Sequence, residues 1–153
     1  MKENDIKILE KKIKYKFKNK DLLNTALTHK TYAFEAKTPI EFNERLEFLG
    51  DSVMGFLVAR ELYKSNKYFS EGELTRRRAQ LVNNNYLAQK AKDIGLGEFL
   101  YLGRGETIQN GYSNATNLAN ALEALIGAVF LDSNIETAWK FIKSNVFDET
   151  YIF

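Results

Sequence analysis

Apolar residues recur every three or four positions along most of this chain, whereas the strict alternation typical of half-buried β-strands is scarce. Three- and four-residue spacing places apolar side chains on one face of a helix. The segments that follow this spacing are residues 6–15, 22–32, 42–63, 74–94 and 118–130. The pattern therefore predicts an all-α fold.

Short polar motifs predict where some of these helices begin. Residues 38–41, Thr-Pro-Ile-Glu, combine an N-cap, a proline suited to the first helical position and a capping-box glutamate, so we expect the helix to start there. Residues 70–73, Ser-Glu-Gly-Glu, have the same capping pattern before the 74–94 segment. Glycines at 95, 97, 103, 105 and 111 predict a connection rather than a helix. No Gly-Lys-Ser or Gly-Lys-Thr follows them, which argues against a phosphate loop.

Acidic residues interrupt two of the predicted helices in a regular way. Glu44, Glu47 and Asp51 fall within roughly 60° of one another on a helix surface. Like charges on one face destabilise a helix, so this arrangement indicates a site for a divalent cation. The segment 118–131 is apolar apart from Asn120 and Glu123, which share a face. Apolar neighbours predict that Asp51 and Glu123 are buried, and a buried carboxylate needs a metal or a bonded partner.

Length and composition limit the remaining possibilities. A chain of 153 residues fits one domain with a single core, and 44% hydrophobic with 27% charged residues is typical of a soluble protein. No apolar run is long enough for a membrane span or a signal region, so we expect a cytoplasmic protein without membrane contact. The absence of cysteine and the single histidine argue against thiolate and zinc sites. Any metal would be held by oxygen, which favours magnesium, manganese or calcium.

Basic residues are grouped in two places, although the net charge is only +2. Lysines crowd the first twenty residues, at positions 2, 7, 11, 12, 14, 16, 18 and 20, as a phosphate-facing arm or as a solvated helix face. Arg76, Arg77 and Arg78 form the second group. Arginine suits phosphate contacts, but adjacent helix positions point about 100° apart, so at most two of the three can reach one backbone. A solvated face also explains this triplet.

Residues 43–52, Asn-Glu-Arg-Leu-Glu-Phe-Leu-Gly-Asp-Ser, resemble the signature of the ribonuclease III family. Residues 118–127 resemble its second catalytic segment, and the likeness extends along nearly all of the chain, including residues 26–29, 71–72 and 76–82. The resemblance implies the helical endonuclease-domain fold of that family over residues 1–153, in a homodimer whose acidic sites flank a valley for double-stranded RNA.

The same resemblance implies an endoribonuclease that processes ribosomal precursors and other structured RNAs. Each site would cut one strand of an A-form duplex, leaving a 5′ phosphate, a 3′ hydroxyl and a short 3′ overhang. Two metal ions about 4 Å apart can activate the water and stabilise the leaving oxygen. Mg²⁺ is the expected ion, with Mn²⁺ as a substitute, and no organic cofactor is expected.

The acidic pattern and the family resemblance together predict the roles of individual residues in metal binding, catalysis, RNA binding and dimer formation. Glu47, Asp51, Asn120 and Glu123 are the expected metal ligands, with Asp51 and Glu123 as the catalytic residues. By resemblance, Glu44 and Glu71 serve a second ion or its waters, the arginines 76, 77 and 78 lie in the region that grips RNA, and Phe48 packs into a cavity of the second subunit. Simpler readings stay open: a surface ion pair for Glu44, a helix-dipole contact for Glu71 and core packing for Phe48.

For some other residues we expect a structural role rather than a catalytic one. We expect His29 to be a structural residue rather than a base. Trp139, with Ala138, Phe141 and Ile142, is expected to close the core with the last helix.

Asn120 departs from the family pattern, which usually has an aspartate at this point. A neutral ligand attracts a dication less strongly, so we expect weak metal affinity and a lower metal requirement in Asn120→Asp. The alternative function is a catalytically silent RNA-binding or ribosome-associated scaffold, which the intact acids at 44, 47, 51 and 123 argue against. Bacterial enzymes of the family that the chain resembles normally continue into a double-stranded RNA-binding domain, and we expect this sequence to lack that domain, through truncation or because the chain is naturally short.

Overall fold

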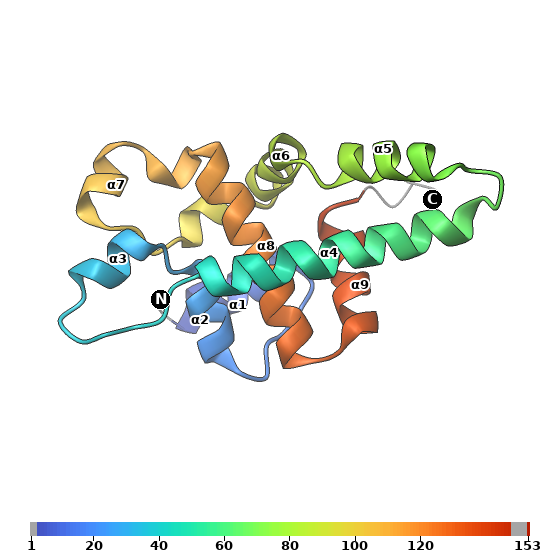
Figure 1. The fold of residues 1–153 in the computed structure, drawn as a ribbon. Helices are drawn as coiled ribbons and strands as arrows, with labels where there is room; N and C mark the ends of the chain where they lie inside the picture. Colours follow the sequence, from blue (N-terminus) through green and yellow to red (C-terminus); the bar gives the residue numbers. More distant parts are fainter. Residues whose placement is uncertain (1–2, 148–152) are drawn as a thin grey trace.

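The computed structural model describes residues 3–147 and residue 153. The predicted all-α fold is confirmed: the described residues form no β-strand, and their β-type pairing is a single bridge between Thr28 and Tyr101. No helix in these ranges combines the length and apolar character that a bilayer crossing needs. The helices are α1 Glu3–Lys12, α2 Lys20–Leu27, α3 Lys30–Glu35, α4 Glu44–Ser65, α5 Glu71–Leu81, α6 Asn84–Ile94, α7 Arg104–Ile108, α8 Ala115–Asp132 and α9 Ile135–Asn145, with short 3₁₀ turns η1 Leu96–Phe99 and η2 Gly111–Ser113 (Figure 1).

Two of the predicted helices are each divided in the structure. The 74–94 segment forms α5 and α6, because the Asn83 side chain accepts a hydrogen bond from the Tyr86 amide at 2.9 Å and caps a new helix. The 22–32 segment forms α2 and α3, separated at Thr28 and His29. The His29 ring caps α3 by accepting from the Thr31 amide. This contact agrees with the structural role expected for His29.

The helix start predicted at residues 38–41 is wrong. Residues 36–43 are not helical, and α4 begins at Glu44 after Asn43, which makes no side-chain capping bond. The backbone N–H of the buried Asn43 instead donates a hydrogen bond to the Thr28 carbonyl at 2.9 Å, so a tertiary contact fixes the start of α4. The capping box at Ser70 and Glu73 is confirmed. The glycine-rich connection is also present, with η1, α7 and η2 as short helical turns inside it.

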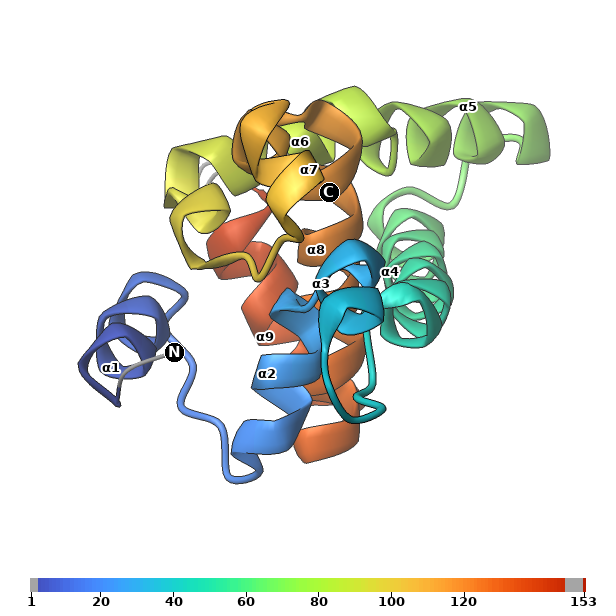
Figure 2. The same cartoon turned by 90° about the vertical axis from the view of Figure 1, so that its left-hand side faces the viewer.

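Helix α8 runs through the middle of the bundle and contacts α2, α4, α6 and α9 (Figures 1 and 2). Between Asn117 and Val129 every residue of α8 except Asn120 is buried, as expected of a helix that is apolar on all sides. Trp139 of α9 is buried at one edge of this core, beside Ala138, Phe141 and Ile142, as predicted. Helix α1, which contains Lys7, Lys11 and Lys12, lies on the side of the bundle away from α4 (Figure 2), and Lys2 lies outside the described residues.

The backbones of α4 and α8 touch at two glycines. A Cβ on Gly50 would lie 1.7 Å from the Glu123 carbonyl oxygen, and one on Gly127 would lie 2.4 Å from the Leu46 carbonyl oxygen. No side chain fits at such distances, so the crossing requires glycine at both positions. The contact places the α4 turn that carries Glu47 and Asp51 directly against Glu123.

We expect Gly50→Ala to destabilise the protein by about 3 kcal/mol or more, because the new methyl group forces two buried backbones apart. Gly55 lies in the same helix, and a Cβ there would meet nothing within 4 Å. Gly55→Ala should therefore raise the free energy of unfolding by about 0.5–1 kcal/mol, since alanine restricts the unfolded chain. Urea denaturation measures both changes. Equal effects of the two substitutions would contradict the proposed crossing.

Candidate active site

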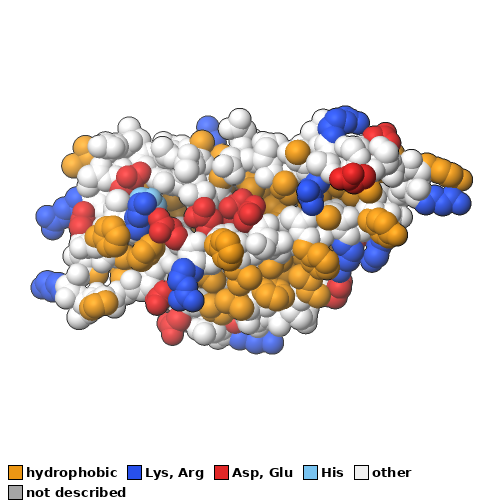
Figure 3. Space-filling model, in the orientation of Figure 1, with side chains coloured by type: hydrophobic (Ala, Val, Ile, Leu, Met, Phe, Trp, Pro, Cys, Tyr) orange, Lys and Arg blue, Asp and Glu red, His pale blue; other side chains and the backbone are white. Residues whose placement is uncertain are grey.

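An open depression of about 490 Å³ lies where α4, α6 and α8 meet. Each predicted metal ligand contributes to its lining, and so does Glu44. The lining residues are Glu44, Glu47, Phe48 and Asp51 of α4, Asn84 of α6, and Asn120 and Glu123 of α8. Acidic side chains gather in the middle of the face that α4 crosses (Figure 3). The fold thus brings together the two acidic segments that lie far apart in the sequence.

Glu123 is the most buried of these acids, with only 6% of its surface exposed. Among the described residues, no hydrogen bond or ion pair engages its carboxyl group. Burial, followed by the charges of Asp51 and Glu47, raises the pKa of Glu123 to about 7. A buried carboxylate without a bonded partner is the group that a bound cation would stabilise.

The other acids are more accessible. Glu47 is half-buried; burial first, and then the charges of Glu44 and Asp51, raise its pKa, while Lys30 opposes this shift. Asp51 is exposed, so the predicted burial of this residue is wrong. Its apolar neighbours Val53 and Met54 turn into the core on the other side of α4 and leave Asp51 facing the depression. A periodic apolar pattern gives the buried side of a helix, and Asp51 lies off that side.

The residue types at the depression fit a hard divalent cation, because every candidate donor is a carboxylate or amide oxygen. In the part of the chain that the structure describes, however, no three acidic side chains converge as the ligands of one ion. Repulsion between carboxylates without a cation favours separated side chains. The backbone sets the acids around one depression, and rotation of their side chains would be needed to enclose an ion.

Glu71 and the three arginines lie outside this lining. Glu71 is exposed in the first turn of α5, where the helix dipole favours an acid. The Arg77 guanidinium lies 4.1 Å over the ring of Phe69, so this arginine packs against its own protein. Arg76 and Arg78 are exposed on the same helix.

Two residues that the sequence did not single out belong to the site. Lys30, the first residue of α3, places its Nζ 3.1 Å from Oε1 of Glu44. Asn84, the first residue of α6, lines the depression opposite the acids of α4. A basic residue directly after His29 was visible in the sequence, but nothing local showed which helix it faces. Asn84 could have been found only if the break between α5 and α6 had been predicted.

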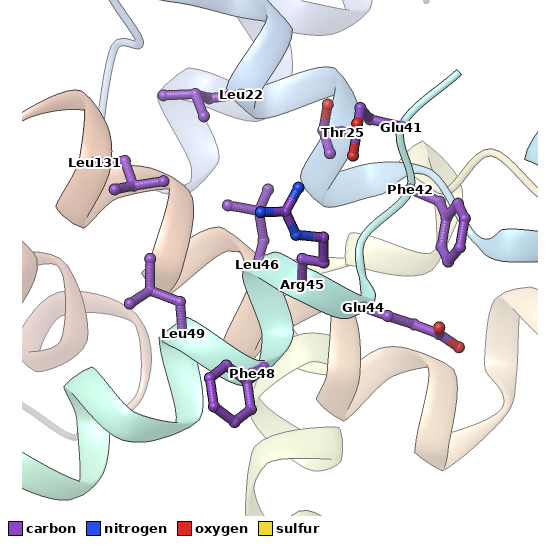
Figure 4. A pocket seen from close by; sticks show the side chains of 10 residues that line it. All are labelled: Leu22, Thr25, Glu41, Phe42, Glu44, Arg45, Leu46, Phe48, Leu49 and Leu131. Atoms are coloured by element: carbon purple, nitrogen blue, oxygen red, sulfur yellow. The ribbon is translucent and has the colours of Figure 1, made fainter. Parts of the chain in front are cut away.

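A second, more apolar hollow of about 640 Å³ lies beside the depression (Figure 4). Leu22, Leu46, Leu49 and Leu131 contribute apolar side chains to it, and Glu44 and Phe48 line both hollows. Phe48 is 77% exposed, which rules out core packing within this chain. Further exposed apolar side chains, Phe56 and Tyr63, follow along α4.

The model of the Ribonuclease-III-like family matches residues 19–150 of the chain. The chain belongs to the ribonuclease III family. It is 47% identical to Ribonuclease 3 of Caldanaerobacter subterraneus subsp. tengcongensis over 88% of this chain, and 44% identical to that of Clostridium tetani over 94%. It spans only 59% and 61% of the length of these two relatives.

Solved structures agree with this ribonuclease III assignment. The nuclease domain of ribonuclease III from Campylobacter jejuni is 38% identical, with a TM-score of 0.82 over 92% of this chain and 97% of that one. That structure is described as showing flexibility in a region involved in dimer formation. Dicer from Pichia stipitis is similar at 27% identity, with a TM-score of 0.60 over 86% of this chain and 55% of that one. The predicted nuclease-domain fold is confirmed.

The raised pKa of Glu123 predicts how stability changes with pH in the metal-free protein. The ordinary pKa of a glutamate is 4.5, which applies to the unfolded state, and the pKa of Glu123 in the folded state is about 7. Between these two pH values the folded state holds more protons than the unfolded state, so stability falls as the pH rises. We expect Glu123→Gln to remove this loss and to stabilise the protein at pH 8 by about 2–3 kcal/mol more than at pH 4.5. Urea denaturation in the presence of a chelator measures this difference. A difference that is independent of pH would contradict the assignment.

Proposed function

We propose that this chain is the nuclease domain of an endoribonuclease that cleaves double-stranded RNA with the help of divalent metal ions. One observation carries the proposal: the buried, partnerless carboxyl group of Glu123 faces Asp51 and Glu47 across a depression open to solvent. Membership of the ribonuclease III family supports the choice of reaction.

The ligand residues have distinct places in this proposal. Glu47, Asp51, Asn120 and Glu123 would hold one ion, and Glu44 at the rim would serve a second ion or its waters. Magnesium is the expected ion, and manganese its substitute. When bound, such ions acidify a water molecule and stabilise the leaving oxygen. Water would add to the phosphorus while the 3′ oxygen leaves and takes a proton, giving 3′-hydroxyl and 5′-phosphate ends.

Protonation of Glu123 competes with metal binding at this site near neutral pH. Its pKa of about 7 means that a large fraction of the metal-free protein carries a proton on this carboxyl group. A carboxyl ligand must release its proton to bind a metal ion. Asp51, which is exposed beside it, places its side chain on the open side of the depression, where substrate can reach it.

RNA contacts would rest on charge and shape rather than on base sequence. A-form duplexes expose phosphates and 2′-hydroxyls in a shallow minor groove, while their major groove is closed to side chains. Arg76 and Arg78 are exposed on α5 and suit phosphate contacts, whereas the packing of Arg77 on Phe69 makes it the weakest candidate of the three. Glu71 in the same helix stays a candidate for the waters of the second ion.

A homodimer would complete the cleaving unit. The exposed Phe48 ring lies beside an apolar hollow that could accept the same residue of a second copy (Figure 4). Two sites, each cutting one strand, would leave the short 3′ overhang. The corresponding biological role is cytoplasmic processing of ribosomal precursors and other structured RNAs.

The first experiment is cleavage of a long labelled RNA duplex at low salt, in separate titrations of Mg²⁺ and Mn²⁺. We expect discrete short products, at least about a hundredfold less cleavage in Glu123→Gln, and a lower metal requirement in Asn120→Asp, since an added carboxylate attracts the ion more strongly. RNA binding without cleavage by the wild type would contradict this activity. If Asn120→Asp then restored cleavage, the site would be one that Asn120 disables; if it did not, the chain would be a catalytically silent scaffold.

The role of Phe48 is tested separately. Phe48→Glu should produce a monomer, because it removes the ring that would fill the hollow and brings a carboxylate toward the leucines and the acids Glu41 and Glu44 of its lining. Double-strand cleavage should fall with it. Tyr68→Glu is a matched control, since Tyr68 is equally exposed but lies beyond the end of α4. Analytical ultracentrifugation reports the mass of each variant. A dimeric Phe48→Glu protein would refute this interface.

A further inference from the structure

Lys30 and Glu44 form an ion pair at the rim of the acidic depression. The Nζ to Oε1 distance is 3.1 Å, and the two side chains are 50% and 51% exposed. The charge of the same ammonium group also opposes the rise in the pKa of Glu47 that burial and the charges of Glu44 and Asp51 cause, so it acts on a second acid of the cluster. Within the described ranges, no other lysine or arginine pairs with an acid that lines this depression.

The two partners of this pair are the first residues of α3 and α4. Asn43, directly before Glu44, donates its amide to the Thr28 carbonyl at 2.9 Å. His29, directly before Lys30, donates its amide to the Tyr101 carbonyl at 3.0 Å and caps α3 with its ring. The pair is therefore built on two anchored backbone segments, unlike a contact between two mobile surface side chains.

From this geometry we propose that Lys30 is an internal counter-ion of Glu44 that competes with a divalent cation at the rim of the depression. A carboxylate that is paired with an ammonium must give up that pair to bind an ion. The remaining positive charge also repels a dication nearby. Both effects have the same sign, so removal of Lys30 tightens metal binding. This inference rests on the proposed metal site and assigns Lys30 as a positioning residue of that site.

The test is a titration of metal-free protein with Mn²⁺ in the absence of RNA. Electron paramagnetic resonance measures the concentration of free Mn²⁺ at each point. Lys30→Met keeps a side chain of similar length without the charge. Its apparent Kd for Mn²⁺ should be roughly two- to fivefold lower than that of the wild type, the range that loss of one exposed ion pair allows. Lys30→Arg keeps the charge and should bind like the wild type.

Two further variants separate competition at Glu44 from other effects. Lys37→Met removes an exposed lysine from the segment between α3 and α4 and should leave the Kd unchanged. In a Glu44→Gln background, Lys30→Met should give a smaller gain, because the contested carboxylate is gone and only the repulsion between the Lys30 charge and the ion remains to be removed. An unchanged Kd in Lys30→Met, or the same gain in the Glu44→Gln background, would refute the inference while the metal site stands. Absence of Mn²⁺ binding by the wild type would refute the metal site and this inference with it.

Discussion

The direct contact between the backbones of α4 and α8 is the constraint on which both the core and the candidate site depend. Gly50 and Gly127 let each helix approach the carbonyl groups of the other, so no side chain separates them at the crossing. The approach buries α8 on nearly all sides and leaves Glu123 at the floor of a depression whose wall is α4. One contact thus closes the core and sets the separation between the acids of the two helices.

The acidic residues of the candidate site lower the stability of the folded protein when no cation is bound. Burial and neighbouring charges make ionisation of Glu123 unfavourable, and Glu44, Glu47 and Asp51 repel one another along one face of α4. The apolar residues of α8 offset this cost, since their burial provides far more free energy than one unfavourable carboxylate removes. A cation bound at the depression would relieve the repulsion and would stabilise the folded state by mass action.

Much of the fold and part of the site could be predicted from the sequence. Helical periodicity predicted the all-α fold, and it placed the acids at 44, 47 and 51 on one helix face and Asn120 with Glu123 on another, because these follow from spacing along a single helix. The start of α4 was misplaced, since it depends on the bond from Asn43 to Thr28 rather than on the local motif at 38–41. Lys30 and Asn84 were missed for the same reason: their places at the site depend on how separate helices pack.

Helix α4 carries three of the candidate metal-binding acids, Glu44, Glu47 and Asp51, together with the candidate subunit contact Phe48. Glu44 and Phe48, one turn apart, line both the acidic depression and the neighbouring apolar hollow. A second copy whose aromatic ring occupied the hollow would therefore also touch residues that line the acidic depression. In a homodimer built on this face, dimer formation and metal binding would be thermodynamically linked. Metal binding would change the dimerisation constant, and dimer formation would change the metal affinity by the same factor.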